Sequence, residues 1–333
     1  MPRTTAKATI TDVAKHAGVS LSTVSRVMNG NPTVDPALAE RVRGVAAELG
    51  YTASPLARSL VLGRTQTVAV VVPDLGNPTF QAVLRGLSRA AATDGYHVLI
   101  ADSAEQVAEE RILAVETRRR TDGLILCAPR MADAELDALL PDVGPVVLVN
   151  RGMDAAVPAV AADYGTAVRG LAEHLYDLGH RRIAYLAGLA RSASNAARLA
   201  ALADFRDTRG DVELIELTSG VDFDSGAATA DAVIASGATA VLAYNDLVAM
   251  GLLSAVAERG IRVPDDLSVT GFDDIPFARY TNPPLTTAAV PAEELGALAW
   301  RALQASLAGG DAPASVLLEP RVVVRGSTGP AAR

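Results

Sequence analysis

Residues 20–29 carry short hydroxyl side chains and one arginine at helical spacing. The hydroxyls of Ser22 and Ser25 would let a helix approach a phosphate backbone closely and hydrogen-bond to it. Arg26 can pair bidentately with guanine, and Leu21 offers an apolar contact to a thymine methyl group. This chemistry suits recognition of double-stranded DNA. The spacing alone also fits a small three-helix bundle that binds another protein, so both interpretations stay open here.

A second set of polar side chains follows apolar segments in the rest of the chain. Asn, Asp and Arg beside an aromatic ring such as Phe80 or Phe272 suit an array of sugar hydroxyls, because they combine bidentate polar partners with an apolar platform. Ligands of open α/β sheets bind at the carboxyl ends of strands, so these segments are expected to converge on one cleft. The segments are Pro73–Phe80, Asn150–Arg151, Gly188–Arg198, Asn245–Asp246 and Gly271–Asp274.

Four of these polar residues, Asn245, Asp246, Asp273 and Asp274, also suit helix capping. Asn245 and Asp246 stand where a helix is expected to begin, and for Asp246 we favour the capping role. For Asp273 we favour contact with a ligand. The two roles are compatible in one side chain.

Sequence signatures of catalysis and metal binding do not occur in the chain. There is no Gly-rich phosphate loop and no HExxH or GxSxG motif. The four histidines are scattered, and His174 and His180 lie six residues apart, which does not place them on one helical face. We interpret the histidines as surface or capping residues, and Cys127 as a buried structural thiol. The sequence therefore predicts no enzyme activity, no catalytic or metal-binding residue and no cofactor.

The elements that must position the first set are three short helices. Thr9 or Thr11 can cap the first, which carries Val13, Ala14 and Ala17 as its apolar face and stops at Gly18. Ser20 caps the second, with Val24 and Val27 pointing inward. The third runs from about Pro36 to Leu49, with Gly50 as its stop. Its expected core residues are Leu38, Val42, Val45 and Leu49.

From Thr67 onward, apolar strands alternate with helical stretches. Continuous Val, Ile and Leu runs separated by helices predict buried parallel sheets in an α/β arrangement, and two sets of such units predict two lobes. The strand candidates are Val68–Val72, His97–Ala101, Leu124–Cys127, Val146–Val149, Ile183–Ala187, Val212–Leu217, Ala240–Tyr244 and Leu267–Thr270.

Charge is unevenly distributed along the 333 residues, whose net charge is −8. Residues 1–64 hold eight basic and four acidic side chains, so the acidic excess lies entirely in the remainder. A basic head on an acidic body is expected when only the head meets phosphate. No apolar run is long enough to cross a membrane, and the N-terminus lacks the apolar core of a signal peptide. We therefore expect a cytoplasmic protein without a membrane partner.

The segment TDVAKHAGVSLSTVSRVMNG closely resembles the headpiece of the LacI/GalR family of bacterial transcription regulators. The resemblance continues along nearly the whole chain. It implies that Leu21, Ser22 and Arg26 read operator bases. It also implies backbone contacts for Thr23, Ser25, Asn29 and Tyr51.

The stretch YTASPLARSLVLGRT follows the head and is too short to form a stable helix alone in water. In the resembling family it folds on DNA, pairs with its twin from the other subunit and inserts a leucine into the minor groove. Leu60 occupies that position, and such a wedge unstacks a base step and bends the duplex. Ala53 stands where the family usually has proline, and Pro55 follows Ser54, which changes the entry to this helix. A plain flexible linker is the alternative.

The passages Ala243–Pro291 and His174–Gly188 also match the family closely. The match implies that Asn245 and Asp273 bind effector and that Phe80 stacks on it. In two places the chain departs from the pattern. The arginine that often grips effector falls on Ala196, with Arg198 close by, and the aspartate common after the fourth strand is Asn150. The resemblance thus implies a neutral, polar effector, most simply a sugar, although Arg151, Arg191 and Arg198 would also allow a carboxylate or purine. The expected effector-binding set is Phe80, Asn150, Arg198, Asn245 and Asp273.

Together these features predict an all-α helix-turn-helix headpiece and an α/β body of two doubly wound lobes, similar to a periplasmic binding protein. The expected function is that of a homodimeric repressor that binds a palindromic operator and responds to an effector. A transport-type sugar-binding protein and a sugar-modifying enzyme with an accessory domain are the alternatives. The predicted boundaries are 1–50 for the headpiece, 51–64 for the hinge and 65–333 for the effector-binding and dimerisation domain, with lobe 1 at about 65–162 and 292–318, and lobe 2 at about 163–291 and 319–333.

Overall fold

The computed structural model describes residues 8–30, 33–52, 63–151, 157–310 and 314–331. The chain divides into two compact units, Met1–Gln66 and Thr67–Arg333. We call them the head and the body and describe each by itself.

Three helices form the described part of the head, and their ends follow from local side-chain chemistry. Thr9 caps the first helix, accepting from the Asp12 backbone N–H while the Asp12 carboxylate accepts from the Thr9 N–H. Gly18 ends that helix with φ of 66°, a left-handed conformation that glycine adopts without strain. Ser20 caps the second helix by accepting from the Thr23 N–H. The helices are α1 (Ile10–Ala17), α2 (Leu21–Met28) and α3 (Pro36–Glu48).

The head core confirms the apolar faces predicted for α1 and α2 but corrects that of α3. Val13, Val24 and Val42 are fully buried. On α3 the other fully enclosed side chains are Ala39 and Ala46. Leu38, Val45 and Leu49, which the sequence predicted as core, are only partly buried and pack around this centre. The larger side chains of α3 lie at the edge of this core, where part of each stays in contact with solvent.

The first lobe of the body is built on a sheet of six parallel strands, counted over the described residues, in the order β11-β5-β4-β3-β1-β2. Alternate residues of each strand face opposite sides. Val70, Ile125 and Val147 pack toward α5 and α13, whereas Val71, Leu126 and Leu148 pack toward α6 and α7. The strands are β1 (Thr67–Val72), β2 (His97–Asp102), β3 (Gly123–Cys127), β4 (Val146–Val149), β5 (Ala159–Ala162) and β11 (Val316–Leu318), and the helices are α5 (Pro78–Thr93), α6 (Val107–Arg118), α7 (Asp133–Leu139) and α13 (Ala292–Leu307).

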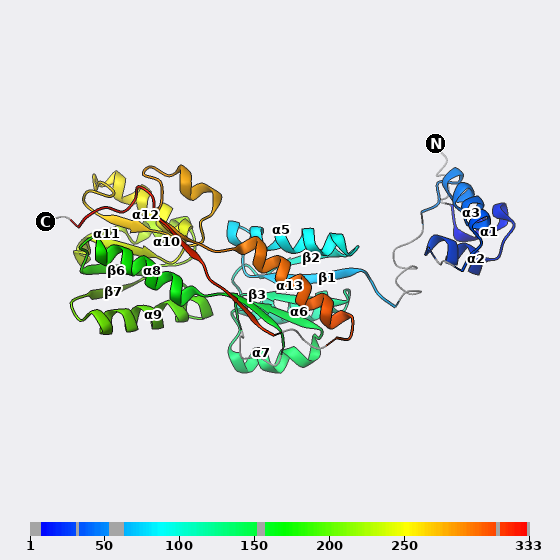
Figure 1. Cartoon of the computed structure of the whole chain (residues 1–333), viewed down its shortest axis with the longest axis horizontal. Coiled ribbons are helices and arrows are strands. Elements are labelled where there is room, and N and C mark those ends of the chain that lie inside the picture. Colours follow the sequence, from blue (N-terminus) through cyan, green and yellow to red (C-terminus); the bar gives the residue numbers. More distant parts are fainter. Residues whose placement is uncertain (1–7, 31–32, 53–62, 152–156, 311–313, 332–333) are drawn as a thin grey trace. The chain divides into compact units, whose positions relative to one another are not determined.

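Helices α5 and α13 lie side by side on one face of this sheet (Figure 1), in close backbone contact. A Cβ atom on Gly86 would lie 1.9 Å from the Glu293 carbonyl oxygen, and one on Gly296 would lie 2.0 Å from the Val83 oxygen. Only glycine permits this approach. It joins the C-terminal part of the chain firmly to the first lobe.

The second lobe has a four-stranded parallel sheet in the order β7-β6-β8-β9, again covered on both faces. Tyr185 and Leu242 face α8 and α9, whereas Leu186 and Val241 face α11 and α12. The strands are β6 (Arg182–Ala187), β7 (Glu213–Thr218), β8 (Ala240–Ala243) and β9 (Ser268–Thr270), and the helices are α8 (Tyr164–Asp177), α9 (Ala193–Arg209), α10 (Phe223–Ala228), α11 (Ala230–Ser236) and α12 (Asp246–Glu258).

The eight strands expected from the sequence are present, with ends shifted by at most one residue. Four others were not predicted. They include β5 and β11, and a two-stranded antiparallel sheet formed by β10 (Thr287–Ala289) and β12 (Arg321–Val323). The chain passes from the first lobe to the second after β5, returns before α13 and leaves again between β11 and β12. The lobe and domain boundaries given above stay a prediction.

Two single residues of the body complete the comparison with the sequence. Cys127 is buried, as predicted. His180 is also buried, contrary to the surface or capping role assigned to it. Its ring lies within hydrogen-bond distance of the Thr239 hydroxyl, the Ser268 hydroxyl and the Gly329 carbonyl, and these partners satisfy the buried nitrogens. Among the helices described, none is both long and apolar enough to cross a bilayer.

Candidate functional sites

Helix α2 presents the predicted contact residues on the face opposite the head core. Leu21 is 49 % exposed, an unusual environment for leucine, and Ser22 and Arg26 are exposed as well. Val24 and Val27 anchor the other face. The helix thus offers solvent one apolar, one hydroxyl and one cationic group within about one and a half turns.

The hydroxyl groups at the start of α2 contact one another. The Ser20 oxygen lies 2.8 Å from that of Ser22 and 2.9 Å from that of Thr23. At the other end, the Asn29 amide nitrogen donates to Ser25 at 3.4 Å. These contacts hold the polar side chains of both ends of the helix in defined positions.

The two remaining head predictions fall outside α2. Tyr51 is partly buried against the three-helix core, and its backbone N–H donates to Ala46 at 2.8 Å. Leu60 lies outside the described residues. Their contact roles stay predictions.

In the body, the five predicted effector-binding side chains surround one cavity, at the carboxyl ends of strands from both sheets. Its free volume is about 30 Å³. The five are Phe80, Asn150, Arg198, Asn245 and Asp273.

Backbone strain gathers at this cavity. Ala128, Asn150 and Asp273 line it with φ values of 45°, 56° and 106°, all in a region that non-glycine residues rarely adopt. Such conformations persist only where the surroundings enforce them, and they cluster at functional sites. Each of the three directly follows a strand or lies within three residues of its end.

Asp273 connects the lobes across the cavity. Its carboxylate accepts a hydrogen bond of 2.9 Å from the Thr79 hydroxyl, which belongs to α5 of the first lobe. Burial raises the pKa of Asp273 to about 6, against the opposing effects of Arg198 and Thr79. The group is thus ionised at neutral pH and available as an acceptor.

Arg198 is 2 % exposed and enclosed by aromatic rings. Its guanidinium carbon lies 4.0 Å from the Phe272 ring centre, 4.5 Å from that of Tyr164 and 4.7 Å from that of Tyr244. Nε and Nη1 have no hydrogen-bond partner among the described residues, which leaves two buried donors for a ligand. Ala196, where the family arginine was expected to fall, is exposed, so the cation at this cavity is Arg198.

Asparagine residues at the cavity also stabilise the fold locally. Asn150 accepts from the Ala162 N–H, and Asn245 caps α12 by accepting from the Val248 N–H. Asp246 does not cap this helix, contrary to the prediction. It is fully buried and accepts from the Ile275 N–H and the Thr287 hydroxyl, and burial together with the charge of Asp273 raises its pKa well above the usual value.

Other lining residues were missed. Tyr164 begins α8, two residues after the end of β5, a strand that was not predicted, whereas Tyr244 precedes Asn245 and could have been found from that position. Phe272, expected as a platform, is instead fully buried and does not line the cavity, and its ring centre lies 5.6 Å from that of Tyr164. The other lining residues outside the predicted segments are Glu105, Ala128, Arg130 and Val221, whereas Asn77, Thr79 and Ser194 lie within segments that were expected to converge on the cleft.

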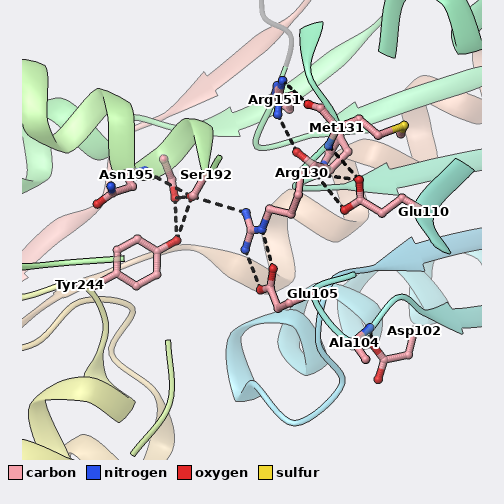
Figure 2. A network of polar contacts seen from close by, with 12 residues as sticks. Asp102, Ala104, Glu105, Glu110, Arg130, Met131, Arg151, Ser192, Asn195 and Tyr244 are labelled. Atoms are coloured by element: carbon pink, nitrogen blue, oxygen red, sulfur yellow. Dashed lines mark hydrogen bonds and ion pairs between the residues drawn. The ribbon is translucent and has the colours of Figure 1, made fainter. Parts of the chain in front are cut away.

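A network of polar contacts surrounds Arg130 at the cavity (Figure 2). Its guanidinium forms an ion pair with Glu105, and the chain continues to Ser192 and Tyr244 of the second lobe. Burial opposes the charge of Arg130, but Glu105, Tyr244 and Glu110 together outweigh this effect, so the pKa of the guanidinium is raised. Two arginines and two carboxylates line the cavity, so its formal charge is balanced.

Comparison with known proteins matches the head and the body to two different family models. Residues 9–54 match the family model of bacterial regulatory proteins, lacI family, and residues 172–328 match a periplasmic binding protein-like domain. The HTH-type transcriptional repressor CytR of Escherichia coli K12 is 33 % identical over 331 residues, covering 96 % of each chain. The chain belongs to the lacI family. Its fold matches that of the lac repressor dimer bound to operator and the anti-inducer ONPF, with a TM-score of 0.89. The two chains are 27 % identical, and the match covers 97 % of this chain and 100 % of the other.

A second similar structure was solved as a complex with a sugar. The complex of the transcriptional regulator CelR with cellobiose matches 96 % of this lacI-family chain and 99 % of its own, with a TM-score of 0.72 and 29 % identity.

Proposed function

We propose that this chain is a transcription repressor that binds a specific DNA operator and changes its affinity when a small polar effector enters the body cavity. One observation carries the proposal: the chain that presents Leu21, Ser22 and Arg26 on an exposed helix also encloses a polar cavity between two lobes. DNA binding alone would not account for the cavity, and sugar binding alone would not account for the exposed helix.

The effector is a neutral, hydroxyl-rich molecule, most simply a sugar. Glu105 and Asp273 balance Arg130 and Arg198, so the cavity has no net charge to hold an anion. Arg198 offers unpartnered donors, Asp273 offers an acceptor, and Phe80 offers an apolar surface. The relative CelR was solved with cellobiose, which fits this class.

The repressor acts as a homodimer on a palindromic operator in the cytoplasm. The lac repressor, which it resembles over its whole length, was solved as a dimer on operator DNA. Effector favours one arrangement of the lobes, and this shifts the population of dimers whose two heads can both engage their half-sites. It acts by binding and not by catalysis, in keeping with relatives that are transcription regulators.

A gel-shift titration tests the DNA-binding proposal, with palindromes from upstream of the protein's own gene or a neighbouring gene. We expect a salt-sensitive shift of the dimer on one palindrome and a much weaker one on scrambled DNA. Absence of any sequence preference would leave the transport-type alternative. Release of a reducing sugar product from a glycoside would favour the enzyme alternative.

Leu60 is proposed as the minor-groove wedge of the hinge. Leu60→Ala should weaken specific binding and reduce bending of the operator, because no apolar group then unstacks the central base step. Bending can be measured by the mobility of circularly permuted operator fragments. Unchanged bending would support the flexible-linker alternative instead.

A further inference from the structure

Arg130 forms part of the cavity wall at the boundary between the two lobes. It follows β3 of the first lobe and is 4 % exposed. Its Nε and Nη2 atoms donate to the two carboxylate oxygens of Glu105 at 2.8 and 2.9 Å. Its third nitrogen, Nη1, lies 3.4 Å from the Ser192 hydroxyl of the second lobe, beyond the usual N–H···O range of about 2.7–3.2 Å. Nη1 is therefore the least satisfied donor of this guanidinium.

The backbone that carries Arg130 is held from two sides (Figure 2). The buried carboxylate of Glu110 accepts from the backbone N–H groups of Arg130 and Met131, at 2.8–2.9 Å. Arg151 donates to the carbonyl oxygens of Pro129 and Met131, both at 2.7 Å. Two charged side chains thus fix a three-residue segment. A donor fixed in advance loses little conformational freedom when a ligand binds.

The charge pattern around Nη1 restricts what can bind there. A guanidinium only donates, so the ligand atom beside it must be an acceptor. Glu105 already neutralises Arg130, and an anion would be repelled by that carboxylate. A methyl or ammonium group would leave the buried N–H unpaired. An uncharged oxygen satisfies each of these conditions.

Two hydroxyl groups stand on the far side of this position. The Ser192 and Tyr244 oxygens lie 3.0 Å apart in the second lobe, and Ser192 also caps α9 by accepting from the Asn195 N–H. A hydroxyl of a ligand can accept from Nη1 and donate its own hydrogen to one of them. A ligand with hydrogen in place of that hydroxyl can do neither.

We propose that Arg130 is an effector-contacting residue whose Nη1–H, oriented by Glu105, donates to one uncharged hydroxyl of a sugar at the boundary between the lobes. This inference rests on the proposed function, because it takes a sugar as the effector. It adds a specificity determinant on the first lobe to Asp273 and Arg198 of the second.

Isothermal titration calorimetry tests it in two steps. D-ribose, D-galactose, D-glucose and cellobiose are titrated into the intact protein, and then the monodeoxy derivatives of whichever sugar binds. We expect wild type to bind one deoxy derivative on the order of 10–100-fold more weakly than the parent sugar. Arg130→Gln should bind the parent sugar more weakly by a similar factor and no longer discriminate against that derivative.

Two further variants supply an alternative substitution at Arg130 and a control. Arg130→Lys keeps the charge beside Glu105 without the forked donor, so it should show the same loss of discrimination even if Arg130→Gln folds poorly. Arg182→Gln is the control, because Arg182 forms a more exposed arginine–glutamate pair with Glu213 at the opposite, amino end of the second sheet. It should bind every sugar as wild type does.

The outcomes separate this inference from the proposed function. If wild type binds none of the sugars, the proposed effector class is wrong, and the Arg130 contact is withdrawn with it. If a sugar binds, and Asp273→Asn weakens it while both Arg130 variants keep wild-type affinity and discrimination, only the role of Arg130 is overturned.

Discussion

The outer face of α2 and the body cavity both gather polar side chains, but in opposite environments. On α2 the residues predicted to read bases, Leu21, Ser22 and Arg26, are close in sequence and exposed, so water hydrogen-bonds to their polar groups until DNA replaces it. At the cavity, Arg198 and Arg130 are nearly fully buried and come from segments about 70 residues apart. There, each charge must be matched within the protein or by a ligand. We therefore expect substitutions on the exposed face of α2 to leave stability unchanged, whereas substitutions at the cavity should change both ligand binding and stability.

Among the substitutions considered, one at Asp273 should have the largest effect on ligand binding. Asp273→Asn keeps an oxygen for Thr79 and a residue type that tolerates positive φ, but removes the charged acceptor. We expect sugar affinity to fall about 100-fold, or about 3 kcal/mol for a charge-assisted hydrogen bond. Calorimetry measures this, and operator affinity without sugar should stay within about twofold of wild type because the head is a separate unit. Equal sugar binding by wild type and variant would contradict the assignment.

A single contact on α2 should matter somewhat less. Arg26→Ala is expected to weaken specific operator binding about 30-fold, within the range of about 1–3 kcal/mol for a bidentate contact to guanine. The exposed side chain leaves no buried partner unpaired, so the thermal stability of the head should not change. Fluorescence anisotropy with labelled operator measures the loss, and Arg41→Ala on α3 serves as an exposed-arginine control. A uniform loss on specific and scrambled DNA would mean that Arg26 contacts only phosphate.

The cavity should respond to pH through Asp273. Its pKa of about 6 lies above its usual value of 3.8, so it contributes stability that is fully present below pH 3.8 and is lost as pH rises through 6. Sugar binding has the opposite dependence, because the acceptor must be ionised. Affinity at pH 5 should be about tenfold lower than at pH 7.

Calorimetry at several pH values, with Asp273→Asn at raised sugar concentration as the control, measures this dependence. The variant should show a flat profile over the same range. A wild-type profile that is equally flat would remove Asp273 from the binding step.

The smallest expected effects come from removing the serine caps of α2 and α9, Ser20 and Ser192. Ser20→Ala should destabilise α2 by about 1 kcal/mol through loss of its cap, which hydrogen exchange of the α2 amides in the whole protein can measure. Ser192→Ala removes the same type of cap from α9 but also a buried partner of Tyr244, so it should lower both stability and sugar affinity. If Ser192→Ala changed stability alone, the link between cap and cavity would be refuted.

Much of the fold followed from sequence patterns, within clear physical limits. Long apolar runs such as those of β1 and β3 are buried on both faces and have an unmistakable composition. Strands β10, β11 and β12 have only three residues each, and their partners are distant in sequence, so no local pattern marks them. His180 was misread for the same reason, since its three hydrogen-bonding partners come from residues 239, 268 and 329.

By itself the sequence determined the helices of the head, the exposed face of α2, the α/β character of the body and the segments that converge on the cavity, and its resemblance to the family singled out the five residues now found there. Helical and strand periodicity are local properties, and the carboxyl ends of parallel strands meet by geometry. Only the tertiary structure decided that Arg198 lies among three rings, that Asp246 is buried rather than capping, and that Glu105 and Arg130 pair at the cavity. Those outcomes depend on distances between residues far apart in the chain, where burial forces charges to find partners that no local spacing reveals.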